Sequence, residues 1–142
     1  MERVIQEFVD RFIAAQPALV ERYATTKPES YAQIVKDVVE LVRDESDDET
    51  PDPERIHEID DGEYQGTLLF VIGASGYQPS TYWATHTYYG SCSGCDTLQS
   101  LDHDWGWEDE EPDLERRKQA AEGYGLIALH LVQRLTLVET TR

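Results

Sequence analysis

Lysine is scarce in this chain, and bases as a whole are outnumbered by acids. There are 29 aspartates and glutamates against 12 lysines and arginines, which gives a formal net charge of -17 at pH 7. The only lysines are Lys27, Lys36 and Lys118. Binding to nucleic acid or to anionic lipid depends on cationic side chains that displace counterions. The composition therefore argues against DNA, RNA and membrane surfaces as partners.

Long apolar runs and a secretory signal are also missing. No apolar run approaches the roughly 20 residues that a membrane-spanning helix needs. The first residues, MERVIQEFVDRF, mix acids with apolar side chains, so they lack the basic segment and apolar block of a signal peptide. We therefore expect a cytoplasmic protein without a membrane-spanning segment.

The surplus of acids has three interpretations. An acid-rich, lysine-poor surface is typical of adaptation to high salt, and it also serves simple solubility. A third interpretation is that the acids imitate the charge of phosphates and bind a DNA-binding protein. Net charge is an argument about solubility and association rather than about fold. The sequence leaves these interpretations open and does not indicate an oligomeric state.

The N-terminal third of the chain predicts helices. Apolar residues at helical spacing predict an amphipathic helix over residues 4–16. Pro17 lacks the N–H that a continuing helix would use, so we expect a break there and a short second helix over 18–24. Thr26 begins a capping-box pattern that predicts a further helix over 28–44.

The remainder predicts an antiparallel sheet and a final helix. Three strands are expected, at residues 55–59, 64–72 and 81–89. Asp96 has cap spacing and predicts a short helical turn after them. A long C-terminal helix opens at Pro112, continues through the apolar run LIALHLVQRLTLV and is expected to bury His130. The predicted fold is α+β, a single domain over residues 1–142 with N-terminal helices, a three-stranded meander and the C-terminal helix packed on the sheet.

Charge is distributed unevenly along the chain. Two acidic segments, 44–54 and 102–112, are predicted loops because they offer little apolar surface to bury. The stretch 64–100 between them has one formally charged residue, Asp96. Buried central strands would explain this gap, and so would an uncharged surface that presents hydroxyls and aromatic rings to a ligand. The predicted binding patch consists of Tyr82, Tyr88, Tyr89, Ser93 and Asp96.

The run YYGSCSGCDTLQ, residues 88–99, holds both cysteines of the chain, Cys92 and Cys95. A Cys-x2-Cys turn can direct two thiolates to one zinc ion, and His86 or His103 would then have to complete the ligand set. A redox pair is the second interpretation of the two cysteines, although the acidic surroundings raise the pKa of a thiol and so disfavour the thiolate. Inert buried thiols are the third. The sequence leaves all three open.

The motifs of common catalytic sites are absent from the sequence. Asp102-His103-Asp104 has no serine or cysteine context that would make it a triad, and the glycine-rich segment 73–76 lacks a P-loop lysine. The sequence therefore favours a small acidic binding protein whose site, for a protein partner or another ligand, is the uncharged patch. The alternative is a metal- or thiol-dependent enzyme centred on Cys92 and Cys95.

The run DGEYQGTLLFVIGASGYQPSTYW, residues 61–83, followed by YYGSCSGCDTLQ, resembles a pattern in small uncharacterised proteins of phages and prokaryotes. The resemblance implies no activity and no role for any single residue. It does imply that the glycine-serine-cysteine turn is a distinctive feature of the chain.

Overall fold

The structure is a computed structural model that describes residues 2–44, 50–60, 62, 66–74, 81–90, 96–106 and 113–138. The helices are α1 (Glu2–Thr25), α2 (Tyr31–Val42), α3 (Thr97–Trp105) and α4 (Leu114–Gln133). The strands are β1 (Pro51–Asp60), β2 (Gly66–Ala74), β3 (Tyr82–Tyr89) and β4 (Thr136–Val138). The predicted α+β class is confirmed. In the described part of the chain, no helix is both long and apolar enough to cross a membrane.

Helix α1 continues unbroken through Pro17, so the predicted break is wrong. The proline lies on the exposed side of the helix, where water can reach the carbonyl group that its missing N–H leaves unbonded. The opposite side of α1 buries Phe8, Phe12 and Leu19. Packing of that side holds the helix together across the proline.

Helix α2 begins later than the capping-box pattern predicts. Its N-cap is Ser30, whose hydroxyl accepts a hydrogen bond from the Gln33 N–H at 3.1 Å. Thr26 instead donates its backbone N–H to the Arg22 carbonyl at 2.9 Å, which continues the hydrogen bonding of α1. Ser30, and not Thr26, is therefore the residue that caps α2.

The sheet is antiparallel in the order β1-β2-β3-β4. The predicted three-stranded meander is present. Residues 136–138, which the sequence pattern places in the final helix, form a fourth strand instead. Helix α4 ends at Gln133, Leu135 is buried, and β4 then pairs with the first residues of β3, Val138 opposite Tyr82. The β-branched residues Thr136 and Val138 suit this strand.

Both predicted acidic loops are too long. Strand β1 already begins at Pro51 and includes Pro53, which it tolerates because it is an edge strand with one side free of pairing. Helix α3 extends to Trp105, where Gly106 ends it with a positive φ of 100°. The rest of the two segments, 45–49 and 107–112, lies outside the described residues.

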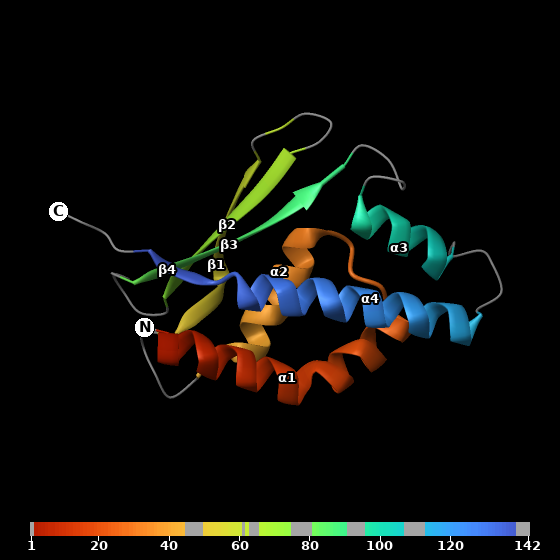
Figure 1. The fold of residues 1–142 in the computed structure, drawn as a ribbon, viewed down its shortest axis with the longest axis horizontal. Helices are drawn as coiled ribbons and strands as arrows, with labels where there is room; N and C mark the ends of the chain where they lie inside the picture. The colour runs from red at the N-terminus through yellow and green to blue at the C-terminus, as the bar shows by residue number, and fades with distance from the viewer. Residues whose placement is uncertain are drawn as a thin grey trace.

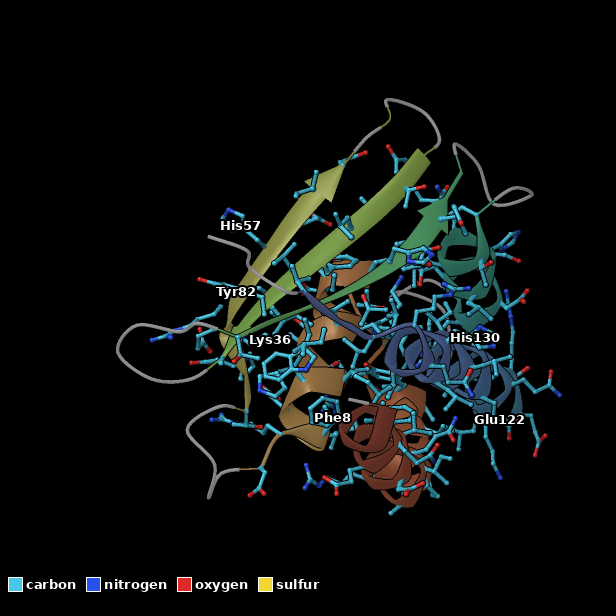
Figure 2. All side chains as sticks on the ribbon, turned by 60° about the vertical axis from the view of Figure 1, so that its left-hand side comes forward. Phe8, Lys36, His57, Tyr82, Glu122 and His130 are labelled. Atoms are coloured by element: carbon cyan, nitrogen blue, oxygen red, sulfur yellow. The ribbon has the colours of Figure 1, made fainter. Side chains whose placement is uncertain are left out.

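The core lies between one face of the sheet and the helices, and α1 and α4 run side by side beneath the sheet (Figure 1). On the inner face, Trp83 of β3 meets Phe8 of α1 edge to face, with 5.9 Å between ring centroids. The Thr85 hydroxyl donates to the Leu131 carbonyl at 2.6 Å and joins β3 to α4. His57 of β1 points away from the helix layer (Figure 2). The sheet therefore has one covered face and one face that the described helices leave open.

Candidate functional site

The structure divides the predicted binding patch between the two faces of the sheet. Tyr82 and Tyr88 alternate with the buried residues of β3, so they lie on the open face, where Tyr88 is 64% exposed. Tyr89 and Asp96 lie on the helix side, next to each other in an acidic hollow. Ser93 lies outside the described residues. The five positions therefore do not form one surface.

The structure describes two of the four predicted zinc ligands, His86 and His103. Cys92 and Cys95 lie outside the described residues. The His86 carbonyl accepts from Arg134 at 3.1 Å, and the His103 carbonyl accepts from Arg116 at 2.7 Å.

Among the described residues there is no group of three or more potential metal ligands. A zinc site at Cys92 and Cys95, with His86 or His103 as a further ligand, stays a prediction.

Asp96 is the buried N-cap of α3, and its carboxylate is fully used. One oxygen accepts from the Tyr31 hydroxyl at 2.7 Å and from the N–H groups of Leu98 and Gln99 at 2.9 and 3.2 Å. The other accepts from the Gly90 N–H at 2.9 Å. The Gln99 side chain donates back to the Gly90 carbonyl at 3.0 Å. Asp96 thus joins α2, α3 and the end of β3, and its role is to hold the fold.

Three further aspartates accept hydrogen bonds from tyrosine hydroxyls. The pairs are Tyr23 with Asp37 at 2.6 Å, Tyr89 with Asp60 at 2.5 Å, and Tyr124 with Asp102. Burial, and then the bond to an aspartate, raises the pKa of Tyr23, Tyr31 and Tyr124 above that of a free tyrosine. Sequence reasoning missed these pairs because the partners are far apart in the chain.

A cavity of about 400 Å³ lies beneath the C-terminal end of β3, between α3 and α4. Its apolar wall comes from Leu101, Leu126 and Ile127, together with the ring of Tyr31. Gly123 of α4 shapes this wall, because a Cβ there would overlap the Leu101 side chain. The absence of a side chain at Gly123 lets α3 lie close to α4 at one end of the cavity.

Thr87 supplies the most informative polar group in this cavity. It is 8% exposed, it lines the cavity, and its hydroxyl makes no hydrogen bond to any residue that the structure describes. Thr85 lies two positions earlier on the same face of β3 and is 3% exposed, but its hydroxyl is bound to the Leu131 carbonyl. The Thr85 hydroxyl is therefore bonded to α4, whereas the Thr87 hydroxyl faces the cavity.

The basic side chains in the lining come from the end of α4. Arg134 is partly buried and donates one Nη1 hydrogen bond to the His86 carbonyl. His130 lies on the same side of α4 and is exposed, so the prediction of a buried core histidine is wrong (Figure 2). Both residues sit in an apolar run, and the sequence gives no sign that they share a cavity with β3.

A second hollow, of about 380 Å³, adjoins Tyr31 on its other side and is acidic. Asp60 and Asp96 in its lining already accept tyrosine hydroxyls, and Glu29 and Glu58 are exposed. The cavity beneath β3 differs, since its described lining offers apolar surface, hydroxyls, one arginine and one histidine and contains no carboxylate.

No protein-family model, no curated protein and no solved structure matches this chain.

Proposed function

We propose that the protein is a non-catalytic binding protein and that a small molecule occupies the cavity beneath the end of β3. The observation that carries this proposal is the hydroxyl of Thr87, which lines the cavity without a hydrogen-bond partner among the described residues. This hydroxyl is not among the fully buried polar atoms that lack a partner, so solvent reaches it through the cavity. A ligand that bonds to this hydroxyl takes the place of that solvent.

The size and composition of the cavity support the proposal. Ligand sites are typically concave, roughly 300–1,000 Å³ in volume, and apolar with a few placed polar groups. This cavity has about 400 Å³ and the same kind of lining. Leu126 lines it and is 49% exposed, so the cavity is accessible from outside. Thr87 and Tyr88 also belong to the stretch in which Asp96 is the single formal charge.

The proposal is tested with three probes that share one apolar skeleton: naphthalene-1-carboxylate, naphthalene-1-carboxamide and 1-naphthylmethylammonium. We expect at least one of them, at millimolar concentration, to shift the backbone amide resonances of Gly123 and Ile127, which line the cavity. Binding is measured by two-dimensional NMR titration of the labelled full chain.

A matched pair of variants locates the binding. Leu126→Trp places a larger ring at the cavity mouth and is expected to abolish the shifts. Leu114→Trp makes the same change on the same helix at a residue that is 74% exposed and does not line the cavity, so binding should persist. The proposal fails if none of the probes shifts these resonances, or if Leu126→Trp leaves binding unchanged.

A further inference from the structure

We infer that the ligand of this cavity carries an anionic group, which binds to Arg134, and an apolar body, which lies against Leu101 and Leu126. This inference rests on the proposed function and names the class of ligand: an amphipathic monocarboxylate. The first support is the contrast in charge. In a chain with a net charge of -17, the described lining of this cavity holds one formal cation, Arg134, together with His130, and no acid.

Arg134 has unused donors that suit a carboxylate. A guanidinium group has five N–H donors, and Arg134 uses one of its nitrogens on the His86 carbonyl. Arg11, Arg22 and Arg55 each form an ion pair with an aspartate. Arg134 forms no ion pair within the part of the chain that the structure describes. A carboxylate can accept two parallel hydrogen bonds from such a fork.

The position of Arg134 is fixed by the backbone around it. It is the C-cap of α4, where its backbone N–H donates to the His130 carbonyl at 3.0 Å. Its side chain is held from the other side by the bond to β3. The partial negative charge at the end of α4, about half an elementary charge, is smaller than the full charge of the guanidinium. An anion is therefore still favoured at this end.

The part of the lining at Tyr31 disfavours an anion. There the Tyr31 hydroxyl donates to the Asp96 carboxylate and accepts from the Leu98 N–H, so it has no donor left for a ligand. The negative charge of Asp96 lies directly behind it. Gly123 and Arg134 mark the two ends along α4, eleven positions or roughly 16 Å apart. The ligand is thus oriented with its apolar body toward Tyr31 and its carboxylate toward Arg134.

The three naphthalene probes distinguish this inference from the proposed function. We expect the wild-type protein to bind naphthalene-1-carboxylate about ten-fold more tightly than the carboxamide, the effect of one charge-assisted hydrogen-bond pair. The ammonium probe should bind more weakly than both. Added potassium chloride should weaken binding of the carboxylate and leave the carboxamide unchanged, because salt screens only the charged interaction.

Variants of Arg134 assign the preference to one side chain. Arg134→Gln should reduce the affinity for the carboxylate to that for the carboxamide, whereas Arg134→Lys should keep part of the preference because it keeps the charge. Lys118→Gln removes the same charge from an exposed residue of α4 outside the cavity and should change nothing. Circular dichroism and thermal melting check that each variant is folded.

The possible results distinguish a failure of this inference from a failure of the proposed function. Equal binding of carboxylate and carboxamide to the wild-type protein overturns the inference and leaves the proposed function standing. A preference that survives Arg134→Gln in a folded protein also overturns it, and so does a carboxylate affinity that does not respond to salt. Absence of binding by all three probes overturns the inference and the proposed function together.

Discussion

At the scale of single residues, Thr85 and Thr87 form a natural comparison, because they share one strand and one face. Thr85→Val removes the bond to the Leu131 carbonyl, so we expect it to lower the free energy of unfolding by about 1–2 kcal/mol. Thr87→Val removes a hydroxyl that has no described partner and should leave this free energy unchanged or raise it. Urea denaturation measures both. Equal losses in the two variants would show that Thr87 has a partner in the unliganded protein.

The buried tyrosine hydroxyls predict how the protein responds to alkali. The folded-state pKa of Tyr23, Tyr31 and Tyr124 is raised, first by burial and then by the bond to an aspartate. An unfolded tyrosine loses its proton near pH 10, so the unfolded chain ionises first as the pH rises. The stability from these pairs is therefore complete below about pH 10 and falls above it.

Absorbance of tyrosinate at alkaline pH checks this expectation. Of the eight tyrosines, Tyr23, Tyr31 and Tyr124 should stay protonated at about pH 11 while the protein is folded, and all eight should ionise in urea. Tyr31→Phe should reduce the step between the two conditions by one tyrosine. A folded protein in which all eight ionise together would contradict the assignment.

Some residue-level features could be predicted from the sequence and others could not. Trp83 and Thr85 lie on one face of β3 and His86 on the other, as the two-residue period of a strand requires. The bond between Tyr31 and Asp96 joins positions 65 apart, and no local pattern indicates it. The same holds for the meeting of Thr87 and Arg134 in one cavity, which depends on how α4 crosses β3.

At the scale of secondary-structure elements, two aspartates that cap helices should differ in importance. Asp113 caps α4 with one bond to the Arg116 N–H and is exposed, so Asp113→Ala should cost about 0.5–1 kcal/mol of stability. Asp96 caps α3 and is also the acceptor for buried donors of Tyr31 and Gly90. Asp96→Ala leaves these donors unpaired and should cost about 3 kcal/mol or more.

Urea denaturation of the two alanine variants tests this ranking. Asp96→Asn serves as a control, since it keeps the size of the side chain and one acceptor oxygen and should lie between the wild type and Asp96→Ala. Similar losses for Asp113→Ala and Asp96→Ala would mean that Asp96 acts only as a cap and does not join α2 and β3 to α3.

The limits of prediction at this scale have physical causes. Periodicity located α1, α2 and the meander, because their apolar positions follow one regular spacing. The continuation of α1 through Pro17 depends on tertiary packing, which outweighs the local preference of proline. The boundary between α4 and β4 lies inside a run that is apolar throughout, where a helix and a buried strand look alike.

At the scale of the whole molecule, the net charge of -17 predicts that stability rises with salt. The surface carries many more acids than bases, and their repulsion is screened over about 10 Å at 0.1 M salt and about 3 Å at 1 M. We expect the thermal midpoint to increase between dilute buffer and molar potassium chloride. Chloride is preferred to sulfate because sulfate stabilises many proteins through exclusion from their surfaces.

Differential scanning calorimetry in dilute buffer and in molar potassium chloride tests whether the thermal midpoint rises with salt. A midpoint that stays flat or falls would show that repulsion between surface acids is not the dominant electrostatic contribution. A rise would favour the interpretation of the composition as an adaptation to high salt over the imitation of phosphate charge, because a mimic needs its charge only where its partner binds.

The packing of α1 on α4 also has a consequence for biosynthesis. The Gln16 side chain donates to the Gly125 carbonyl at 3.2 Å across a separation of 109 residues, and the bare Gly125 backbone makes room for Val20. A ribosome adding about 5–20 residues per second needs roughly 5–20 seconds to synthesise that interval. For this time α2 can already contact α1, through Tyr23 and Asp37 among others, but the part of α1 that packs on α4 has no cover, so we expect the core to close only after α4 has left the exit tunnel. The nascent chain would then depend on chaperones, or on its own acidic charge, to stay free of aggregation until its last helix arrives.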